Sequence, residues 1–278
     1  MRVIRTAAEM REVRRAMTGS VGLVATLGGV HRGHTTHMDT ARPQCDILVG
    51  SLFLNPTQFA GNEDLSTYPS NEPADLAEFE KHGADLVFVP SKQEIYPPGE
   101  VLAVVDPGPI GNLLEGAHRA GHFEGVATVV ARLFSIISPT KATFGEKDAQ
   151  QLRVIQYVNE SFGSGIEIIP IPTVREEDGL AISTRNAYLS PEERDAATIL
   201  FKALTIAKLS FDSGERSGEV LRFMLDSILA GEPLAEVDYA SIADVDTFEE
   251  LDEVEHSARA LLAVKIGNAR LIDNFLLA

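Results

Sequence analysis

The chain has 278 residues, of which 44% are hydrophobic, and it carries a single cysteine and a formal net charge of −17. This length and hydrophobic content indicate a globular protein with room for two domains. The excess of acidic residues argues against DNA or RNA as a partner, because nucleic-acid binders normally present a basic face. No apolar run reaches the ~18 residues that a membrane span requires.

Two features bear on the cellular compartment. Residues 1–15 are charged and helical in pattern, without the apolar stretch of a signal peptide. Cys45 cannot form an internal disulfide, which agrees with a reducing environment. We therefore expect a cytoplasmic protein that contacts neither a membrane nor a nucleic acid.

Strands and helices alternate through the first 172 residues. Thr6 and Glu9 have the spacing of a capping box and predict a first helix. The pattern then predicts, in order, a strand at 20–25, a helix from Gly33, a strand at 46–54, a helix at 72–83, a strand at 84–90, a helix at 122–138, a strand at 141–145, a helix at 148–160 and a strand at 166–172. Strands that alternate with helices of this length predict a parallel α/β sheet.

The pattern changes after residue 174. The polar stretch 175–179, "REEDG", is followed by helix patterns at 190–209 and 214–230 and by strand patterns at 236–244, 258–267 and 269–275. Helices followed by strands predict a smaller α+β domain. We place the first domain at residues 1–174 and the second at 175–278, with "REEDG" as the hinge.

Polar loops follow four of the predicted strands. They are "TLGGVHRGH" (26–34), "NPTQF" (55–59), "FGEKDAQQ" (144–151) and "PTVREEDGLAISTRN" (172–186). In open parallel sheets, ligands bind beyond the carboxyl ends of the strands. The four loops together therefore predict one ligand site.

The loop at 26–34 has the composition of an anion site. Gly28, Gly29 and Gly33 allow close backbone approach, and the helix start offers unpaired N–H groups. His31 and His34 can donate hydrogen bonds to phosphate oxygens. A metal pair and a plain solvated turn are the alternatives, although no further ligands follow at a recognisable metal-site spacing. The Walker A pattern is absent.

Two further loops supply cations. Lys147 lies at a strand-to-helix junction, where Asp148 suits an N-cap or a ribose contact. Arg185 stands beside Ser183 and Thr184, which suits a mobile phosphate clamp because Arg favours bidentate phosphate contacts. A solvated helix start and a Ser/Thr turn are the structural alternatives.

Neutral amide side chains and a pair of basic residues suggest a pocket that binds an organic acid. Asn55 and Gln58 suit hydroxyl or carboxylate recognition, although Asn-Pro is also a common turn element that braces loops. Gln151 lies near the helix end that carries Lys147. Arg119 and His122 precede the long apolar helix and suggest a carboxylate or phosphate pocket.

Taken together, these loops resemble one protein family. The motifs H-x-G-H, N-P-x-Q-F, G-x-x-R-x-G-H-F, F-G-x-K-D-x-Q-Q and D-G-L-A-x-S-x-R-N occur here in the order found in AMP-forming pantoate–β-alanine ligases. This family is part of the H-I-G-H nucleotidyltransferase superfamily. The resemblance implies a Rossmann-like first domain, a homodimer, and the use of ATP with Mg2+.

The resemblance also implies the reaction. Pantoate would react with ATP to form a pantoyl adenylate and pyrophosphate, and β-alanine would then displace AMP to give pantothenate, a coenzyme A precursor. Three alternatives remain open: a related adenylate-forming ligase for another hydroxy acid, a nucleotidyltransferase with a phosphate acceptor, and a nucleotide-binding protein without catalysis.

Residue roles follow from the same resemblance. His34 would be the proton donor, with His31, Lys147 and Arg185 as the other catalytic groups at the phosphates. The implied ATP-binding residues are Leu27, Gly28, His31, His34, Gly145, Glu146, Lys147, Asp148, Val174, Ile182, Ser183, Thr184 and Arg185. The implied pantoate and β-alanine residues are Thr26, Asn55, Gln58, Arg119, His122 and Gln151. Asp75 would lie near Mg2+.

Seven positions depart from the family pattern, namely Ala25, Leu27, Thr35, His37, Ser70, Ala120 and Thr184, of which Thr184 keeps the hydroxyl of the usual serine. Thr35 and His37 stand where the family usually has leucines, so one face of the helix after Gly33 is unusual. The departures leave open whether activity or acid preference is altered.

Overall fold

The computed structural model describes residues 1–59, 65–99 and 103–278. Its first unit is a parallel sheet of six strands in the order β1-β4-β3-β2-β5-β6. The strands are β1 (Arg2–Ile4), β2 (Val21–Thr26), β3 (Ile47–Leu52), β4 (Leu86–Phe88), β5 (Lys141–Gly145) and β6 (Glu167–Ile171). The alternation of strands and helices predicts this parallel sheet, and the family resemblance implies its Rossmann-like arrangement.

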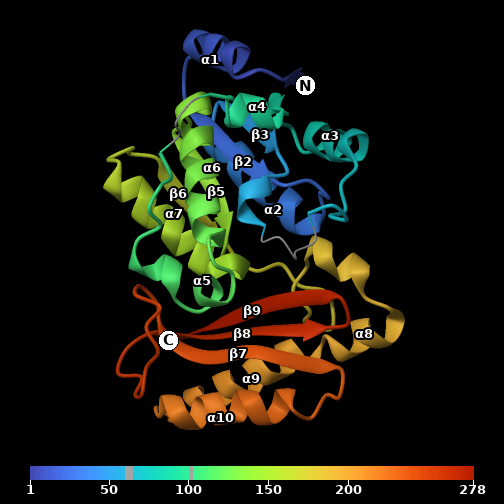
Figure 1. Ribbon diagram of the computed structural model, residues 1–278, viewed down its shortest axis with the longest axis vertical. Helices are drawn as coiled ribbons and strands as arrows, with labels where there is room; N and C mark the ends of the chain where they lie inside the picture. Colours follow the sequence, from blue (N-terminus) through green and yellow to red (C-terminus); the bar gives the residue numbers. More distant parts are fainter. Residues whose placement is uncertain (60–64, 100–102) are drawn as a thin grey trace.

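Helices cover both faces of this sheet (Figure 1). The helices of this unit are α1 (Ala7–Ala16), α2 (Arg32–Ala41), α3 (Glu72–Lys81), α4 (Lys92–Ile95), α5 (Glu115–His118), α6 (His122–Ile137) and α7 (Ala149–Ser161), of which α5 lies beyond the end of the sheet, next to the second unit. On β2, Leu23 packs with α1, α6 and α7, and its neighbour Val24 packs with α2 and α3. Successive side chains of a strand point to opposite faces, so a sheet covered on both sides needs apolar residues at every position.

Short 3-10 turns lie between these elements. They are η1 (Arg42–Gln44), η2 (Pro56–Gln58), η3 (Pro109–Asn112), η4 (Glu146–Asp148) and η5 (Thr184–Tyr188). Three of them, η2, η4 and η5, fall within the polar loops, and they place short stretches of backbone at the carboxyl edge of the sheet.

The second unit is an antiparallel sheet of three strands, β7 (Ala235–Asp244), β8 (Ala258–Ile266) and β9 (Ala269–Leu277). The helices α8 (Pro191–Ala196), α9 (Ile199–Asp212) and α10 (Gly218–Leu229) precede it, and α9 and α10 cover its outer face (Figure 1). On β8, Leu262 packs with these helices, whereas Leu261 packs with Phe123 of α6 and Val158 of α7. The smaller α+β unit therefore lies against the first sheet's helices; the domain boundary near residue 175 stays a prediction.

Four sequence expectations are corrected by the backbone. The helix predicted at 190–209 is two helices, because tight hydrogen bonds such as Thr198 N–H to the Asp195 carbonyl (3.2 Å) interrupt it. The helix predicted from 214 begins at Gly218, after the N-cap Ser217. The third correction is β1, a short edge strand within the region read as helical.

The fourth correction concerns the first helix. Thr6 does accept a hydrogen bond from the Glu9 N–H (3.2 Å) and caps α1. Glu9 does not return the bond, because its carboxylate pairs with Arg2 instead (2.7 Å). Thr6 is thus an N-cap without the full capping box. Among the described residues, no helix is long and apolar enough to cross a membrane.

Candidate active site

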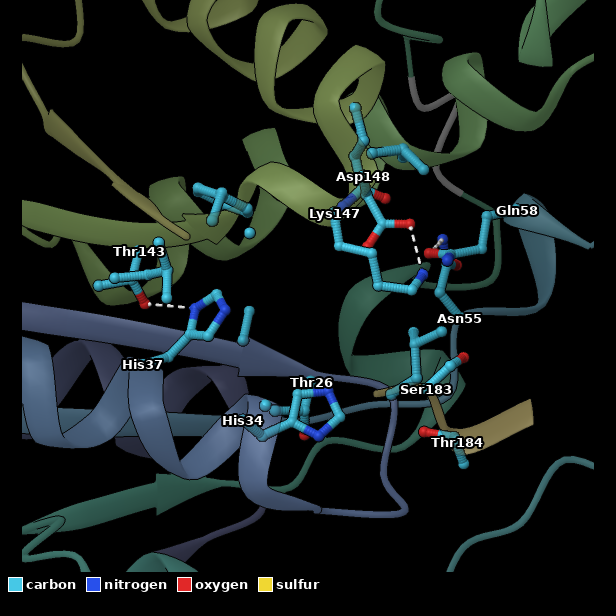
Figure 2. A pocket seen from close by; sticks show the side chains of 18 of the residues that line it. Thr26, His34, His37, Asn55, Gln58, Thr143, Lys147, Asp148, Ser183 and Thr184 are labelled. Atoms are coloured by element: carbon cyan, nitrogen blue, oxygen red, sulfur yellow. Dashed lines mark hydrogen bonds and ion pairs between the residues drawn. The ribbon is translucent and has the colours of Figure 1, made fainter. Parts of the chain in front are cut away.

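A cavity of about 240 Å³ opens at the carboxyl ends of β2, β3, β5 and β6. Figure 2 shows side chains from α2, from the turn after β5 and from the segment after β6 pointing into the same space. The predicted site residues that line it are Thr26, Leu27, His31, His34, Asn55, Gln58, Arg119, His122, Gly145, Lys147, Asp148, Gln151, Val174, Ile182, Ser183, Thr184 and Arg185. Four distant loops therefore converge on one site; the individual ligand roles stay predictions.

The two histidines of the first loop stand at the N-terminus of α2. His31 is the N-cap, and its Nδ1 accepts a hydrogen bond from the Gly33 N–H (3.1 Å). His34 Nδ1 in turn accepts from the His31 N–H (3.4 Å), and the two rings stack with centroids 4.1 Å apart. A neutral imidazole that accepts at Nδ1 carries its proton on Nε2. Both rings therefore present an Nε2–H donor.

Burial keeps these imidazoles neutral. It lowers the pKa of His31 to about 4, with the charge of Lys147 adding to the effect, and it holds the pKa of His34 well below its usual value. Near neutral pH both rings act as hydrogen-bond donors next to a helix start. Main-chain N–H groups and the positive end of a helix dipole also favour an anion at this place.

A cation comes from the turn after β5. Lys147 lies in η4 with its side chain 21% exposed, and its Nζ is 3.5 Å from Asp148 Oδ1. Figure 2 shows Lys147 and Asp148 on the wall of the cavity across from His34. An anionic ligand between them would meet a cation on one side and the imidazole donors on the other.

Asn55 has a bracing role. It is fully buried, and its Nδ2 donates to Gln58 Oε1 (3.1 Å) and to the Gly125 carbonyl (3.3 Å). Its Oδ1 accepts from the Thr57 hydroxyl (2.9 Å) and the Tyr96 hydroxyl (2.9 Å). These contacts use both of its N–H donors and the oxygen, which matches the loop-bracing alternative. They also turn the Gln58 amide oxygen toward Asn55, so the Gln58 NH2 group points away from it.

Arg119 and His122 hold the main chain of Gln58. His122 Nε2 is 3.0 Å from Arg119 Nη1, and a guanidinium can only donate, so Nε2 accepts. His122 Nδ1–H therefore donates to the Gln58 carbonyl (2.8 Å). Gly125 lets α6 approach this turn, because a Cβ there would lie 2.3 Å from the Thr57 carbonyl oxygen.

The segment after β6 closes the cavity from the side of the second unit. Ser183 accepts a hydrogen bond from the Arg185 N–H (3.3 Å), which is the Ser/Thr turn that the sequence left open. Thr184 donates to the Gly29 carbonyl (3.4 Å) and so joins this segment to the histidine loop. Three hydroxyl and guanidinium side chains thereby reach the cavity next to His31 and His34.

Three predicted residues do not line the cavity. Asp75 is 3% exposed, and its carboxylate accepts N–H groups from Gly29 (3.1 Å) and Val30 (2.7 Å), so it supports the histidine loop from behind. Gly28 packs against the same carboxylate, at φ +106°. Glu146 points toward Arg259, 3.8 Å away. The Mg2+ role of Asp75 stays a prediction.

The cavity also has lining residues that sequence reasoning missed as site residues. Part of its wall is apolar and comes from Val126, Val129, Val130 and Leu133 of α6. In the sequence, these residues match an ordinary core helix. His37 also lines the cavity, with Nδ1 3.0 Å from the Thr143 hydroxyl, and burial lowers its pKa to about 4.

Comparison with known proteins gives a consistent result along the whole chain. The family model for pantoate-beta-alanine ligase matches residues 2–276. Pantothenate synthetase from Roseiflexus sp. (strain RS-1) is 50% identical over 277 residues, covering 100% of this chain and 99% of that protein.

Solved structures agree. The crystal structure of pantothenate synthetase from Thermus thermophilus has a TM-score of 0.93 at 42% identity and covers 99% of both chains. That of pantoate-beta-alanine ligase from Francisella tularensis, described as complexed with "Beta-gamma ATP and Beta-alanine", has a TM-score of 0.81 at 31% identity over 99% of this chain and 97% of that one. This chain belongs to the pantoate–β-alanine ligase family.

Proposed function

We propose that this cavity joins pantoate to β-alanine in two steps, through a pantoyl adenylate that stays bound between them. The observation that carries the proposal is the convergence of the His31 and His34 Nε2–H donors, the α2 N-terminus and Lys147 on one space. The Francisella tularensis relative, described as complexed with "Beta-gamma ATP and Beta-alanine", supports ATP and β-alanine as substrates of this chain.

The chemistry requires activation, because a carboxylate does not condense with an amine at neutral pH. In the first step a pantoate carboxylate oxygen attacks the α-phosphorus of ATP, the bond to the bridging oxygen breaks, and pyrophosphate leaves. In the second step the β-alanine amine attacks the acyl carbon, loses a proton and displaces AMP. The site needs to position the reactants and to stabilise charge on the phosphates.

The phosphate side of the cavity fits this task. His31 and His34 donate from one wall, and Lys147 faces them with Arg185 on the segment that closes the site. None of these groups acts as a covalent nucleophile. Their placement supports electrostatic stabilisation of the leaving pyrophosphate and of the α-phosphate in the transition state of the first step.

The acid side is formed by amides over an apolar wall. The NH2 group of Gln58 and the Gln151 amide suit the hydroxyl and carboxylate oxygens of pantoate. The two methyl groups of pantoate suit the α6 side chains Val126 and Val130. Because these α6 side chains offer no hydrogen bonds to water, the apolar wall would also help to protect the adenylate from hydrolysis.

Mg2+ fits this site as a companion of ATP. It is usually held by one or two carboxylates together with substrate phosphates. Among the described residues, no group of three or more His, Cys, Asp or Glu side chains could hold a metal ion. Asp148 is the carboxylate beside Lys147, whereas Asp75 is occupied by main-chain N–H groups. Bound Mg2+ would neutralise phosphate charge, with Asp148 as the nearby ligand.

The family resemblance supports two further assignments, a homodimer and a cytoplasmic location. The first is tested by sedimentation equilibrium, in which a single-chain mass would contradict it. The second is tested by fractionation of the native cells, with recovery in a membrane or exported fraction as the contrary result.

The direct test of the function is the product pattern. Pantoate, β-alanine and ATP should yield pantothenate, AMP and pyrophosphate. Replacing pantoate by related hydroxy acids would reveal a shifted acid preference. Gln58→Ala and Gln151→Ala should raise the KM for pantoate while calorimetry shows little change in ATP binding. Loss of ATP affinity with normal use of pantoate would reverse the assignment of the two amides.

A further inference from the structure

The C-terminal sheet reaches the turn that carries Lys147. Asn274, on β9, is 5% exposed and lies against η4. Its Nδ2 donates one hydrogen bond to the Glu146 carbonyl (2.9 Å) and a second to the Lys147 carbonyl (3.1 Å). A side chain from the second unit thus holds the main chain of a residue that lines the cavity in the first.

A neighbouring charge determines which way the Asn274 amide points. Its Oδ1 accepts a hydrogen bond from Arg259 Nη1 (2.6 Å). Because a guanidinium has donors and no acceptor, the oxygen has to face Arg259 and the NH2 group has to face the two carbonyls. Both amide hydrogens are then used, and the amide is held at each of its polar ends.

The turn itself is a short 3-10 element. Hydrogen-bond geometry in such elements is poorer than in an α-helix, so their position depends more on outside contacts. The residue preceding Asn274, Asp273, anchors β9. Its carboxylate forms a bidentate ion pair with Arg175 (2.6 and 2.8 Å) and accepts a hydrogen bond from the Asn274 N–H (2.8 Å). The brace on η4 therefore comes from a fixed strand.

We propose that Asn274 is a positioning residue for Lys147: it holds the Glu146–Lys147 main chain so that the lysine reaches the phosphates. The inference rests on the proposed phosphate role of Lys147. A displacement of about 1 Å in a catalytic group can lower the rate about 100-fold. Asn274 should thus contribute to catalysis without touching a substrate.

A double-mutant cycle separates positioning from general stability. The enzymes compared are wild type, Asn274→Ala, Lys147→Ala and the double variant, at saturating ATP and pantoate with pyrophosphate exchange as the readout. Asn274→Ala should lower kcat about 10- to 100-fold in the wild type. In the Lys147→Ala background it should lower kcat less than about threefold, because the group that it positions is already gone.

Gln150 offers a matched control. It is also a buried amide, but its side-chain hydrogen bonds go to the Ile110 carbonyl (2.7 Å), the Leu113 carbonyl (2.8 Å) and the Glu115 N–H (3.1 Å), and not to the Glu146 and Lys147 carbonyls. Gln150→Ala should change kcat by the same factor in the wild-type and Lys147→Ala backgrounds. Thermal unfolding of every variant confirms that folded proteins are compared.

Asn274→Asp is a second variant that keeps the test usable if Asn274→Ala does not fold. It has the same size and keeps an oxygen toward Arg259, but it cannot donate to the two carbonyls, so it should show the same loss and the same dependence on Lys147. The proposal is overturned if Asn274→Ala or Asn274→Asp lowers kcat equally in both backgrounds, or by less than about threefold in the wild type. If Lys147→Ala alone keeps wild-type kcat, the phosphate role of the lysine itself is wrong.

Discussion

At the scale of single residues, the hydrogen bond accepted by one histidine ring nitrogen determines that the other ring nitrogen is a donor. His31 and His34 each accept a main-chain N–H at Nδ1, and this leaves Nε2–H as the donor end. Their pKa values lie below the ordinary range, so the donors stay in place at neutral pH without adding charge. Positive charge at the site then comes from Arg119, Lys147 and Arg185, which all line the cavity.

Two lysines lie near the ends of β5, and replacing Lys147 should lower activity much more than replacing Lys141. Lys147→Ala should cost about 2–4 kcal/mol of transition-state stabilisation, as seen when other placed charge stabilisers are removed. Lys141, at the opposite end of β5, pairs with Glu167 (2.8 Å) and serves as the control. Steady-state kinetics of Lys141→Ala should match wild type. Activity of Lys147→Ala within about threefold of wild type would contradict the assignment.

His37 should make the fold sensitive to acid. Its pKa is lowered from 6.5 to about 4 in the native state, so the unfolded chain takes up this proton first as the pH falls. Stability should therefore fall between pH 6.5 and pH 4. Between pH 7 and pH 5, protonation of this group alone should lower the free energy of unfolding by about 2 kcal/mol.

His37→Leu removes this titrating group and introduces the residue type that the family resemblance implies at this position. Urea unfolding at pH 7 and pH 5 should show that the variant loses about 2 kcal/mol less than wild type over that interval. An equal loss in the two proteins would mean that His37 titrates alike in the folded and unfolded chains.

At the scale of elements, one N-terminus serves both folding and chemistry. His31 caps α2 and also presents its ring to the cavity. Asn is a good N-cap but has no imidazole. His31→Asn should keep the melting temperature and lose most pyrophosphate exchange, whereas His31→Ala should lose the exchange and also about 1 kcal/mol of stability. An Asn variant with full exchange activity would show that only the cap matters.

The sequence predicted elements well where side-chain pattern alone decides them. β5 was predicted at 141–145, and the structure has Lys141–Gly145. β1 was missed because three residues hold too little pattern, and its partner β4 lies more than 80 residues away. The break between α8 and α9 was missed because it arises from main-chain bonding at Ala197 and Thr198, which leaves no mark in the hydrophobic pattern.

The candidate site shows the same limit. Polar groups such as Lys147 and Gln58 stand out next to strand ends, so sequence could find them. Val130 and Leu133 could not be separated from core, because the same helical spacing serves both purposes. Sequence patterns do not reveal Asn274, because its proposed role depends on a contact with Lys147, which lies 127 residues away in the chain.

At the scale of the whole molecule, a buried ion pair ties Arg175, at the start of the predicted second domain, to β9. Arg175 pairs with Asp273, which is 3% exposed, and its guanidinium lies 5.1 Å from the Phe201 ring centroid and 4.9 Å from that of Phe275. The residue at the predicted hinge is therefore anchored to the second sheet.

Breaking this pair should destabilise the protein strongly. Asp273→Ala leaves the Arg175 charge without its partner and should cost about 3–5 kcal/mol in urea unfolding. Glu176→Ala, which removes an exposed pair with Arg32 (3.1 Å) in the same segment, should cost less than about 1 kcal/mol. Similar losses in the two variants would mean that burial does not strengthen the Arg175 pair.

The central claim is that the site forms a bound pantoyl adenylate before the amine reacts. Isotope exchange tests it most directly, with labelled pyrophosphate, ATP, pantoate and Mg2+ supplied without β-alanine. We expect label to enter ATP in the wild type and the exchange to fall strongly in His34→Ala, because we propose that His34 acts at the phosphates. Exchange that strictly requires β-alanine, or a reaction that releases ADP and phosphate in place of AMP and pyrophosphate, would contradict the account.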